Sequence, residues 1–198
     1  MADELELKAL VADPGVTRIQ LDAGGAVETF RGMMRDHRFD RGGELALRDE
    51  VLRIRMLEAH SGPRRAILGW KGRTERSPEG YKRRQELECT TEDGAGLVAV
   101  LRALGYATVQ VIDRYVEIFS LEGAVVRLEW YPRMDVLIEV EGPPAAIESA
   151  IRVSGIARRE FLPDNLVAFV ARYETRTGMR AILAEADLHG GLPGWRDA

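Results

Sequence analysis

The sequence predicts an α+β fold in which antiparallel strands carry charges along one face and amphipathic helices cover the other. Charged and apolar residues alternate in the strand-like segments, as at residues 4–8 and 52–56. Because successive side chains of a strand point to opposite faces, the charged residues of each segment share one face. If the strands close into a barrel with the charges inside, its apolar outer surface needs helices to cover it. Amphipathic helical segments are available between and after the strands.

The same alternation has a simpler explanation, which stays open for each strand taken alone. An antiparallel sheet with one face in water shows it without any function. Two features of the whole set favour a shared charged interior. The charged positions are nearly all Glu, Arg and Lys, with few Ser, Thr or Gln residues, and they segregate by strand. Carboxylates dominate residues 4–8 and 136–141, whereas arginines dominate residues 52–56.

Turn residues divide the chain into further elements. Ser61-Gly62-Pro63 predicts a hairpin, and Gly72 to Gly80 a mobile loop. Residues 93–105 form the clearest helix, with Gly105 as its C-terminal cap. The expected strands are 4–8, 51–58, 65–71, 81–90, 107–120, 124–131 and 134–141. The other expected helices are 16–34 (interrupted at Gly24-Gly25), 143–154, 166–175 and 180–188, and the tail 190–198 is expected to be poorly ordered.

Composition is that of a cytoplasmic globular protein of one domain or one domain with an appendage. The chain has 198 residues, 45% hydrophobic and 30% charged, with a net charge of −4, so no global field favours nucleic acid or an anionic membrane. The single Cys89 excludes an internal disulfide, and its position on the apolar side of its strand predicts a buried structural thiol. We expect no membrane span and no signal peptide.

Clustered carboxylates beside clustered guanidinium and ammonium groups suit a polyphosphate ligand. Basic side chains bind phosphate oxygens directly, and carboxylates hold Mg²⁺ or Mn²⁺, which bridges to the remaining oxygens. Phosphoryl transfer depends mainly on positioning and electrostatic stabilisation of this kind.

An ordered set of motifs carries a resemblance to a known family. Glu4-Leu5-Glu6-Leu7-Lys8 resembles the ExExK signature of the CYTH domain, the family of class IV adenylyl cyclases and thiamine triphosphatases, also called triphosphate tunnel metalloenzymes. The later blocks that match in order are Leu52-Arg53-Ile54-Arg55, Leu68-Gly69-Trp70-Lys71-Gly72, Arg84-Gln85-Glu86-Leu87-Glu88, Leu101-Arg102-Ala103-Leu104-Gly105-Tyr106 and Ile138-Glu139-Val140-Glu141. The resemblance covers roughly residues 3–173, most of the chain.

The resemblance implies an eight-stranded antiparallel tunnel whose interior binds a triphosphate and one or two divalent metals. It implies a tunnel domain at residues 1–174, followed by a C-terminal helix and flexible tail at 175–198. The implied metal ligands are Glu4, Glu6, Glu129, Glu139 and Glu141. The implied phosphate-binding residues are Lys8, Arg53, Arg55, Lys71, Arg84 and Arg114, of which Lys8 and Lys71 are also catalytic candidates. Glu86 is expected to orient an arginine or a metal-bound water, and stabilisation of the tunnel wall is the alternative for both Glu86 and Glu88.

The sequence departs from the family pattern at three places. Asp36-His37-Arg38-Phe39-Asp40 resembles the DxYFD block but has Arg38 in place of the tyrosine. Ile112-Asp113-Arg114 keeps the arginine of KxR and lacks its lysine. Residues 130–135 replace the usual leucine-glycine turn. These changes are compatible with the expected tunnel and bear on the expected substrate.

Other candidate sites are weaker. His37, His60 and His189 lack metal-ligand spacing, and Trp70 and Trp130 fall on the apolar side of their strands, which favours core positions. The arginines at 31, 35, 38 and 41 are expected to be solvated. No zinc pattern, glycine-rich phosphate loop or Ser/His/Asp order is present.

The function predicted from these motifs is metal-dependent hydrolysis of inorganic tripolyphosphate or a small organic triphosphate. The first alternative is a class IV adenylyl cyclase, which requires an adenine pocket that the sequence does not locate. The second is a polyphosphate- or nucleotide-binding module without turnover. A homodimer is also compatible with the C-terminal helices.

Overall fold

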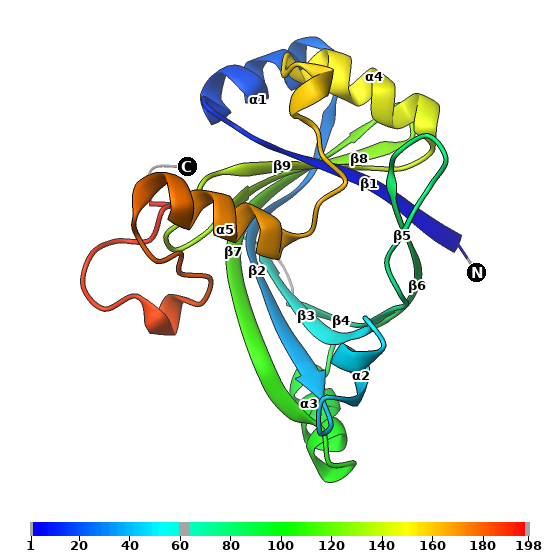
Figure 1. Ribbon diagram of the computed structural model, residues 1–198, viewed down its shortest axis with the longest axis vertical. Helices are drawn as coiled ribbons and strands as arrows, with labels where there is room; N and C mark the ends of the chain where they lie inside the picture. Colours follow the sequence, from blue (N-terminus) through cyan, green and yellow to red (C-terminus); the bar gives the residue numbers. More distant parts are fainter. Residues whose placement is uncertain (1, 60–63, 197–198) are drawn as a thin grey trace.

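The computed structural model describes residues 2–59 and 64–196 and shows an antiparallel barrel surrounded by helices (Figure 1). The sheet order is β1-β9-β8-β7-β2-β3-β4-β6-β5, and β1 also pairs with β6, so that eight strands close and β5 is an extra edge strand. The strands are β1 Ala2–Leu10, β2 Val27–Asp40, β3 Val51–Ala59, β4 Arg65–Lys71, β5 Glu75–Arg76, β6 Lys82–Thr91, β7 Ala107–Leu121, β8 Ala124–Trp130 and β9 Leu137–Glu141. The predicted eight-stranded antiparallel tunnel is therefore confirmed.

The register of the strands brings charged residues together across the closure. Glu4 lies opposite Arg84 and Glu6 opposite Lys82 where β1 meets β6. On the other edge of β1, Lys8 lies opposite Glu139 of β9. Directly opposed residues in an antiparallel pair project from the same face of the sheet. The charged residues of neighbouring strands therefore share the barrel interior.

The helices lie outside the barrel. They are α1 Pro14–Ala23, α2 Glu44–Leu47, α3 Gly94–Ala103, α4 Pro144–Ser154 and α5 Leu166–Thr177, with short 3₁₀ turns at Arg158–Glu160 and Glu185–Asp187. Helices α1, α3 and α5 begin at side-chain caps: Asp93 at the start of α3, for example, accepts a hydrogen bond from the Gly96 amide at 2.7 Å. Figure 1 shows α1 and α4 over β1, β8 and β9, and α3 packs on β3 and β4. Among the described residues, no helix has the length and apolarity needed to cross a membrane.

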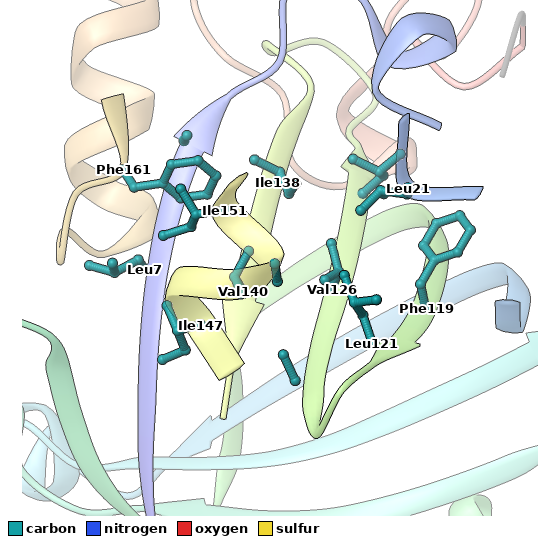
Figure 2. Close-up of a cluster of buried hydrophobic side chains, with 14 of the residues drawn as sticks. Leu7, Leu21, Phe119, Leu121, Val126, Ile138, Val140, Ile147, Ile151 and Phe161 are labelled. Atoms are coloured by element: carbon teal, nitrogen blue, oxygen red, sulfur yellow. The ribbon is translucent and has the colours of Figure 1, made fainter. Parts of the chain in front are cut away.

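The main apolar core lies between the outer face of the barrel and the helices α1 and α4 (Figure 2). Leu7 of β1 and Val140 of β9 are almost completely buried there against Ile147 of α4. These apolar residues are the sequence neighbours of the charged residues that face inward. Burial of the outer face of β1, β8 and β9 under helices therefore fixes which residues face the tunnel.

The region expected to be one interrupted helix at 16–34 divides into a helix and a long strand. Helix α1 ends at Ala23, before Gly24-Gly25, and β2 begins at Val27. Strand β2 pairs with β7 along nearly its whole length and with β3 over its second half. These long-range hydrogen bonds outweigh the weak local helical pattern, which is why the sequence-based expectation was wrong here. Segment 36–40 is consequently part of a barrel strand.

Three further expectations need correction. Residues 180–188 are not a helix but an extended segment with one 3₁₀ turn, because Ile182 pairs with Arg133 through backbone hydrogen bonds of 3.1 and 2.8 Å. Cys89 is exposed instead of buried, and Leu87 on the same face of β6 is also 48% exposed, because, among the described elements, the nearby helix α3 packs on β3 and β4 rather than on β6. In the tail, Trp195 packs against the main core.

The structure also gives the positions of the two tryptophans, the expected loop and the expected domain boundary. Trp130 is buried in the core, as predicted, whereas Trp70 is half-buried. The expected loop at residues 72–80 contains the short strand β5. The expected domain boundary after residue 174 falls within α5. The turn at 61–63 and His60 lie outside the described residues.

Candidate functional site

The barrel encloses a cavity of about 450 Å³ whose wall is strongly charged. Every residue that the motifs nominate for metal or phosphate binding lines this cavity: Glu4, Glu6, Lys8, Arg53, Arg55, Lys71, Arg84, Arg114, Glu129, Glu139 and Glu141. The alternation seen in the sequence explains this placement, because each of these residues lies on the inward face of its strand. Their roles in binding and catalysis remain predictions.

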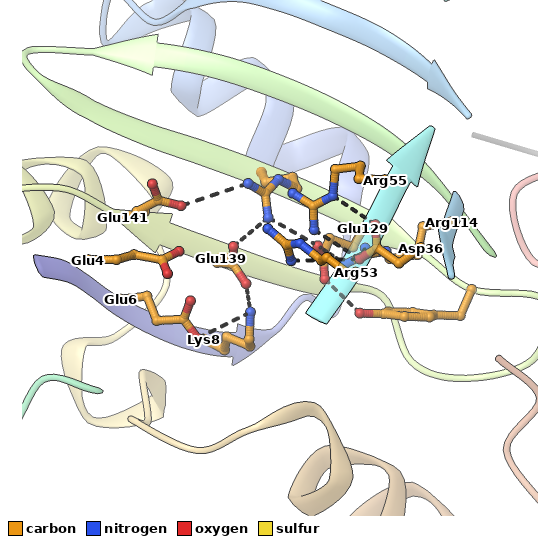
Figure 3. Close-up of polar contacts among 12 residues, drawn as sticks. Glu4, Glu6, Lys8, Asp36, Arg53, Arg55, Arg114, Glu129, Glu139 and Glu141 are labelled. Atoms are coloured by element: carbon orange, nitrogen blue, oxygen red, sulfur yellow. Dashed lines mark hydrogen bonds and ion pairs between the residues drawn. The ribbon is translucent and has the colours of Figure 1, made fainter. Parts of the chain in front are cut away.

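Figure 3 shows two chemically different regions of the cavity wall. We call Glu4, Glu6 and Glu139, from β1 and β9, the acidic wall. We call Arg53, Arg55 and Arg114, from β3 and β7, together with Asp36 of β2, the arginine wall. Lys8 projects from β1 beside Glu139.

The acidic wall has the geometry of a cation site. Its three carboxylates each offer an oxygen, and these oxygens lie within 4.8 Å of one another. Hard divalent cations such as Mg²⁺ and Mn²⁺ prefer oxygen ligands of this kind. The donor set therefore fits the metal that the resemblance implies.

Lysines neutralise the acidic wall. Lys82 contacts Glu6 at 2.5 Å, Lys71 contacts Glu4, and Lys8 contacts Glu139. Burial lowers the pKa of Lys8 to about 8, although the carboxylates of Glu6 and Glu129 act in the opposite direction. This cavity therefore holds a lysine that ionises less readily than one in water.

The other two predicted metal ligands have different surroundings. Glu141 is more exposed than the acidic wall, with 30% of its side chain accessible, and it lies 3.8 Å from Arg127. Burial and the neighbouring Glu4 carboxylate raise its pKa. Glu129 instead accepts hydrogen bonds from Arg114 at 2.9 Å and from the Tyr131 hydroxyl at 2.6 Å. Burial alone would raise its pKa, but Arg114, Lys8 and Arg127 lower the pKa to about 2. Glu129 is thus held as a carboxylate against the arginine wall.

Asp36 organises the arginine wall. Arg55 donates two hydrogen bonds to its carboxylate, at 2.8 and 2.9 Å, and Arg114 donates a third. Burial opposes ionisation, yet Arg55 and Arg114 keep the pKa of Asp36 well below its ordinary value. The sequence-based reasoning did not nominate Asp36, because segment 36–40 was not recognised as part of a strand. Strand parity would have placed it inside.

Arg53 is oriented by acids on β6 and by a glycine on β4. Its guanidinium donates to Glu86 at 2.9 Å and to Glu88 at 3.2 Å, as expected for acids that orient an arginine. Gly69 lies opposite Arg53, and a β-carbon there would be 3.4 Å from the Arg53 Nε. Glycine at position 69 therefore leaves room for this side chain to cross the strand.

Besides Asp36, the cavity wall includes Lys82, Arg127, Arg38 and Tyr131, which were absent from the predicted set. Lys82 and Arg127 share the inward face with the nominated residues Arg84 and Glu129, so parity alone would have found them. Arg127 contacts Glu139 and connects the acidic wall with Glu129, 3.5 Å away. Arg84, which was nominated, donates from Nε to the Gly72 carbonyl at 2.5 Å.

The arginines of the cavity retain unused hydrogen-bond donors. Among the described residues, the buried Nε atoms of Arg38, Arg53, Arg114 and Arg127 have no hydrogen-bond partner. Buried donors without partners are uncommon and costly in native proteins. The oxygens of a polyanion would satisfy them, since guanidinium groups bind phosphate oxygens through adjacent N–H groups.

No family model and no curated protein matches the chain. Solved structures do share its fold. A protein of Pyrococcus horikoshii is 22% identical, with a TM-score of 0.69 over 85% of this chain and 98% of that chain. A "putative adenylate cyclase" of Vibrio parahaemolyticus is 16% identical, with a TM-score of 0.64 over 85% and 97% of the two chains.

A third neighbour covers more of this chain. The "putative adenylyl cyclase" HpAC1 of Hippeastrum, described as having a dominant triphosphatase activity, is 18% identical, with a TM-score of 0.61 over 96% of this chain and 100% of that chain. At these identities the likeness establishes the fold. The closed tunnel and these neighbours fit the CYTH family, which the sequence motifs resemble.

Proposed function

We propose that the protein is a triphosphatase that depends on Mg²⁺ or Mn²⁺ and hydrolyses a linear triphosphate inside the barrel. One observation carries this proposal: three carboxylates suited to a metal face a set of arginines with unused donors in one cavity of about 450 Å³. A triphosphate needs both kinds of partner, because its many oxygens require direct cationic contacts as well as metal bridging.

The chain's own residues would divide the work as follows. The arginine wall binds the phosphate oxygens and orients the chain of phosphates. Lys8 and Lys71 lie next to the acidic wall and stabilise negative charge on the transferred group. Glu4, Glu6 and Glu139 would hold the metal, which supplies charge neutralisation and activation of water. Water adds to the terminal phosphorus while the bond from that phosphorus to the bridging oxygen breaks. The leaving diphosphate keeps the electron pair on this oxygen, and the attacking water loses a proton to solvent, so orthophosphate is released.

We infer hydrolysis of a triphosphate rather than cyclisation of ATP from the aromatic residues of the cavity. The aromatic residues among its described lining residues are Phe39 and Tyr131, and both are almost completely buried. A nucleobase commonly binds by stacking on an aromatic side chain, which neither residue can offer. The dominant triphosphatase activity attributed to the Hippeastrum protein supports the same choice.

Product analysis tests the proposal. Purified protein would be incubated with Mg²⁺ or Mn²⁺ and with tripolyphosphate, thiamine triphosphate or ATP in parallel. Release of orthophosphate that stops with EDTA is expected, and the fastest substrate identifies the preferred triphosphate. Formation of cyclic AMP and pyrophosphate from ATP would instead make the protein a cyclase. Tight triphosphate binding without any product would make it a binding module.

A further inference from the structure

Arg38 has an unusual position in the cavity wall. It lies on β2 directly opposite Arg53 of β3, and both side chains face the cavity. Like charges directly opposite each other destabilise a sheet. The neighbouring opposed pair, Asp36 and Arg55, shows the complementary arrangement that a purely structural wall would be expected to use.

Arg38 also lacks the anionic partner that the other cavity cations have. Its hydrogen-bond partner is the neutral side chain of Gln110 on β7, at 3.0 Å. In the part of the chain that the structure describes, each other lysine and arginine lining the cavity forms an ion pair, whereas Arg38 forms none. Its buried Nε has no hydrogen-bond partner at all. Two adjacent donors of this guanidinium are therefore available to a ligand.

Burial and the nearby cations strengthen this conclusion. Burial is the main cause that lowers the pKa of Arg38, to about 10, and Arg114, Arg53 and Arg84 lower it further. Asp36 opposes the shift without forming an ion pair with Arg38. An anion bound among these arginines would remove their mutual repulsion.

Arg38 lies nearer the mouth of the cavity than Asp36 does. It lies two residues before the end of β2 at Asp40, and the exposed residues Ala46 and Asp49 line the same cavity just beyond that end. Asp36, by contrast, is only 1% exposed. Arg38 therefore extends the arginine wall by one position toward solvent.

We propose that Arg38 is a specificity-determining residue that binds the outermost phosphate of the substrate and selects inorganic tripolyphosphate over organic triphosphates. This proposal rests on the triphosphatase function proposed above. The free terminal phosphate of an inorganic chain carries more negative charge than a phosphate esterified to an organic group. A guanidinium with two free donors and no carboxylate of its own gains most from the more highly charged group.

The test compares Arg38→Gln with the wild type on two ligands. Dissociation constants for tripolyphosphate and ATP would be measured by calorimetry in EDTA, and KM values for both would be measured with Mn²⁺. We expect Arg38→Gln to weaken tripolyphosphate binding about tenfold or more, the usual effect of losing hydrogen bonds to a charged group, and to weaken ATP binding much less. Arg38→Lys keeps the charge but not the paired donors, so its affinity for tripolyphosphate should lie between the affinities of the wild type and of Arg38→Gln.

Arg35→Gln is the matched control, because Arg35 lies on the same strand with its side chain outside the cavity and partly exposed. It should leave both ligands unaffected. Equal weakening of both ligands, or no weakening, in Arg38→Gln would overturn the proposal. Arg38→Gln should unfold at no lower a denaturant concentration than the wild type, since it removes a like-charge pair. If Arg38→Gln does not fold, the ratio of the dissociation constants for tripolyphosphate and ATP in Arg38→Lys decides the question. Failure of the wild type to hydrolyse any triphosphate would refute the proposed function, whereas the measurements in EDTA would still decide the role of Arg38.

Discussion

Arg55 and Asp36 lie opposite each other on β3 and β2, and two hydrogen bonds of 2.8 and 2.9 Å join the guanidinium to the carboxylate inside the barrel. Arg114 of β7 binds the same carboxylate. One acidic side chain thus connects three neighbouring strands and fixes two arginines that face the cavity. This arrangement has consequences for both stability and binding.

Replacement of Asp36 by Asn should destabilise the protein in a pH-dependent manner. At pH 7 we expect a loss of about 3 kcal/mol in the free energy of unfolding, because two buried arginines lose their common carboxylate. The pKa of Asp36 is lowered in the folded state, so its contribution is complete above about pH 4 and declines as the pH falls further. Urea titrations at pH 7 and pH 3 would measure this. The exposed Asp22→Asn is the control, and a difference that grows on acidification would contradict the assignment.

Replacement of Glu139 by Gln should abolish metal-dependent turnover while the fold persists. The substitution removes one of the three clustered carboxylates, and Lys8 and Arg127 each lose one acidic partner. We expect a loss of kcat of at least about 100-fold, together with weaker Mn²⁺ binding measured by electron paramagnetic resonance. Glu4→Gln should behave similarly. The exposed Glu28→Gln is the control, and full activity of Glu139→Gln would remove this residue from the metal site.

Replacement of Arg53 by Ala should raise the KM for triphosphate by about tenfold or more, because a guanidinium with an unused buried donor is lost. Gly69→Val should raise KM by a separate route, since a larger side chain there would displace Arg53 without removing it. Steady-state kinetics measure both effects. Arg64→Ala, at a side chain that is 80% exposed, is the control. An unchanged KM in both cavity variants would show that Arg53 does not contact the substrate.

Replacement of Tyr131 by Phe should affect Arg114 through Glu129. The tyrosine hydroxyl donates to the Glu129 carboxylate at 2.6 Å, and Glu129 in turn accepts from Arg114 at 2.9 Å. We expect the free energy of unfolding to fall by about 1–2 kcal/mol, with an increase in KM that exceeds the decrease in kcat. Urea titration measures the effect on stability, and steady-state kinetics measure the effects on KM and kcat. A selective loss of kcat would indicate instead that Tyr131 acts directly on the reacting group.

Replacement of Glu117 by Gln should reduce stability without changing activity. Glu117 is fully buried outside the tunnel, where Arg18 of α1 donates two hydrogen bonds to it at 2.8 and 2.7 Å and Arg31 lies 3.2 Å away. We expect a loss of about 2 kcal/mol in the free energy of unfolding, because charge-assisted hydrogen bonds attach α1 to β7. Thermal unfolding and triphosphatase assays measure the two properties. A large fall in kcat/KM would connect this cluster to the tunnel.

The sequence by itself determined the face of each strand that is charged and the broad architecture. Alternation at residues 4–8 and 52–56 identified the inward side chains before any pairing was known, because strand geometry fixes side-chain direction every second residue. Local periodicity did not reveal β2 as a strand, since residues 16–34 favour an interrupted helix, and so Asp36 and Arg38 were not assigned to the cavity.

The tertiary structure decided which charges meet. Strand register, set by pairings between residues far apart in the chain, placed Arg38 opposite Arg53 and Asp36 opposite Arg55. Helix packing decided exposure as well: Cys89 has the parity of a buried residue but is exposed, because, in the part of the chain that the structure describes, α3 packs on β3 and β4 rather than on β6. Local periodicity gives the direction of a side chain, whereas its partner and its burial depend on contacts that only the folded chain makes.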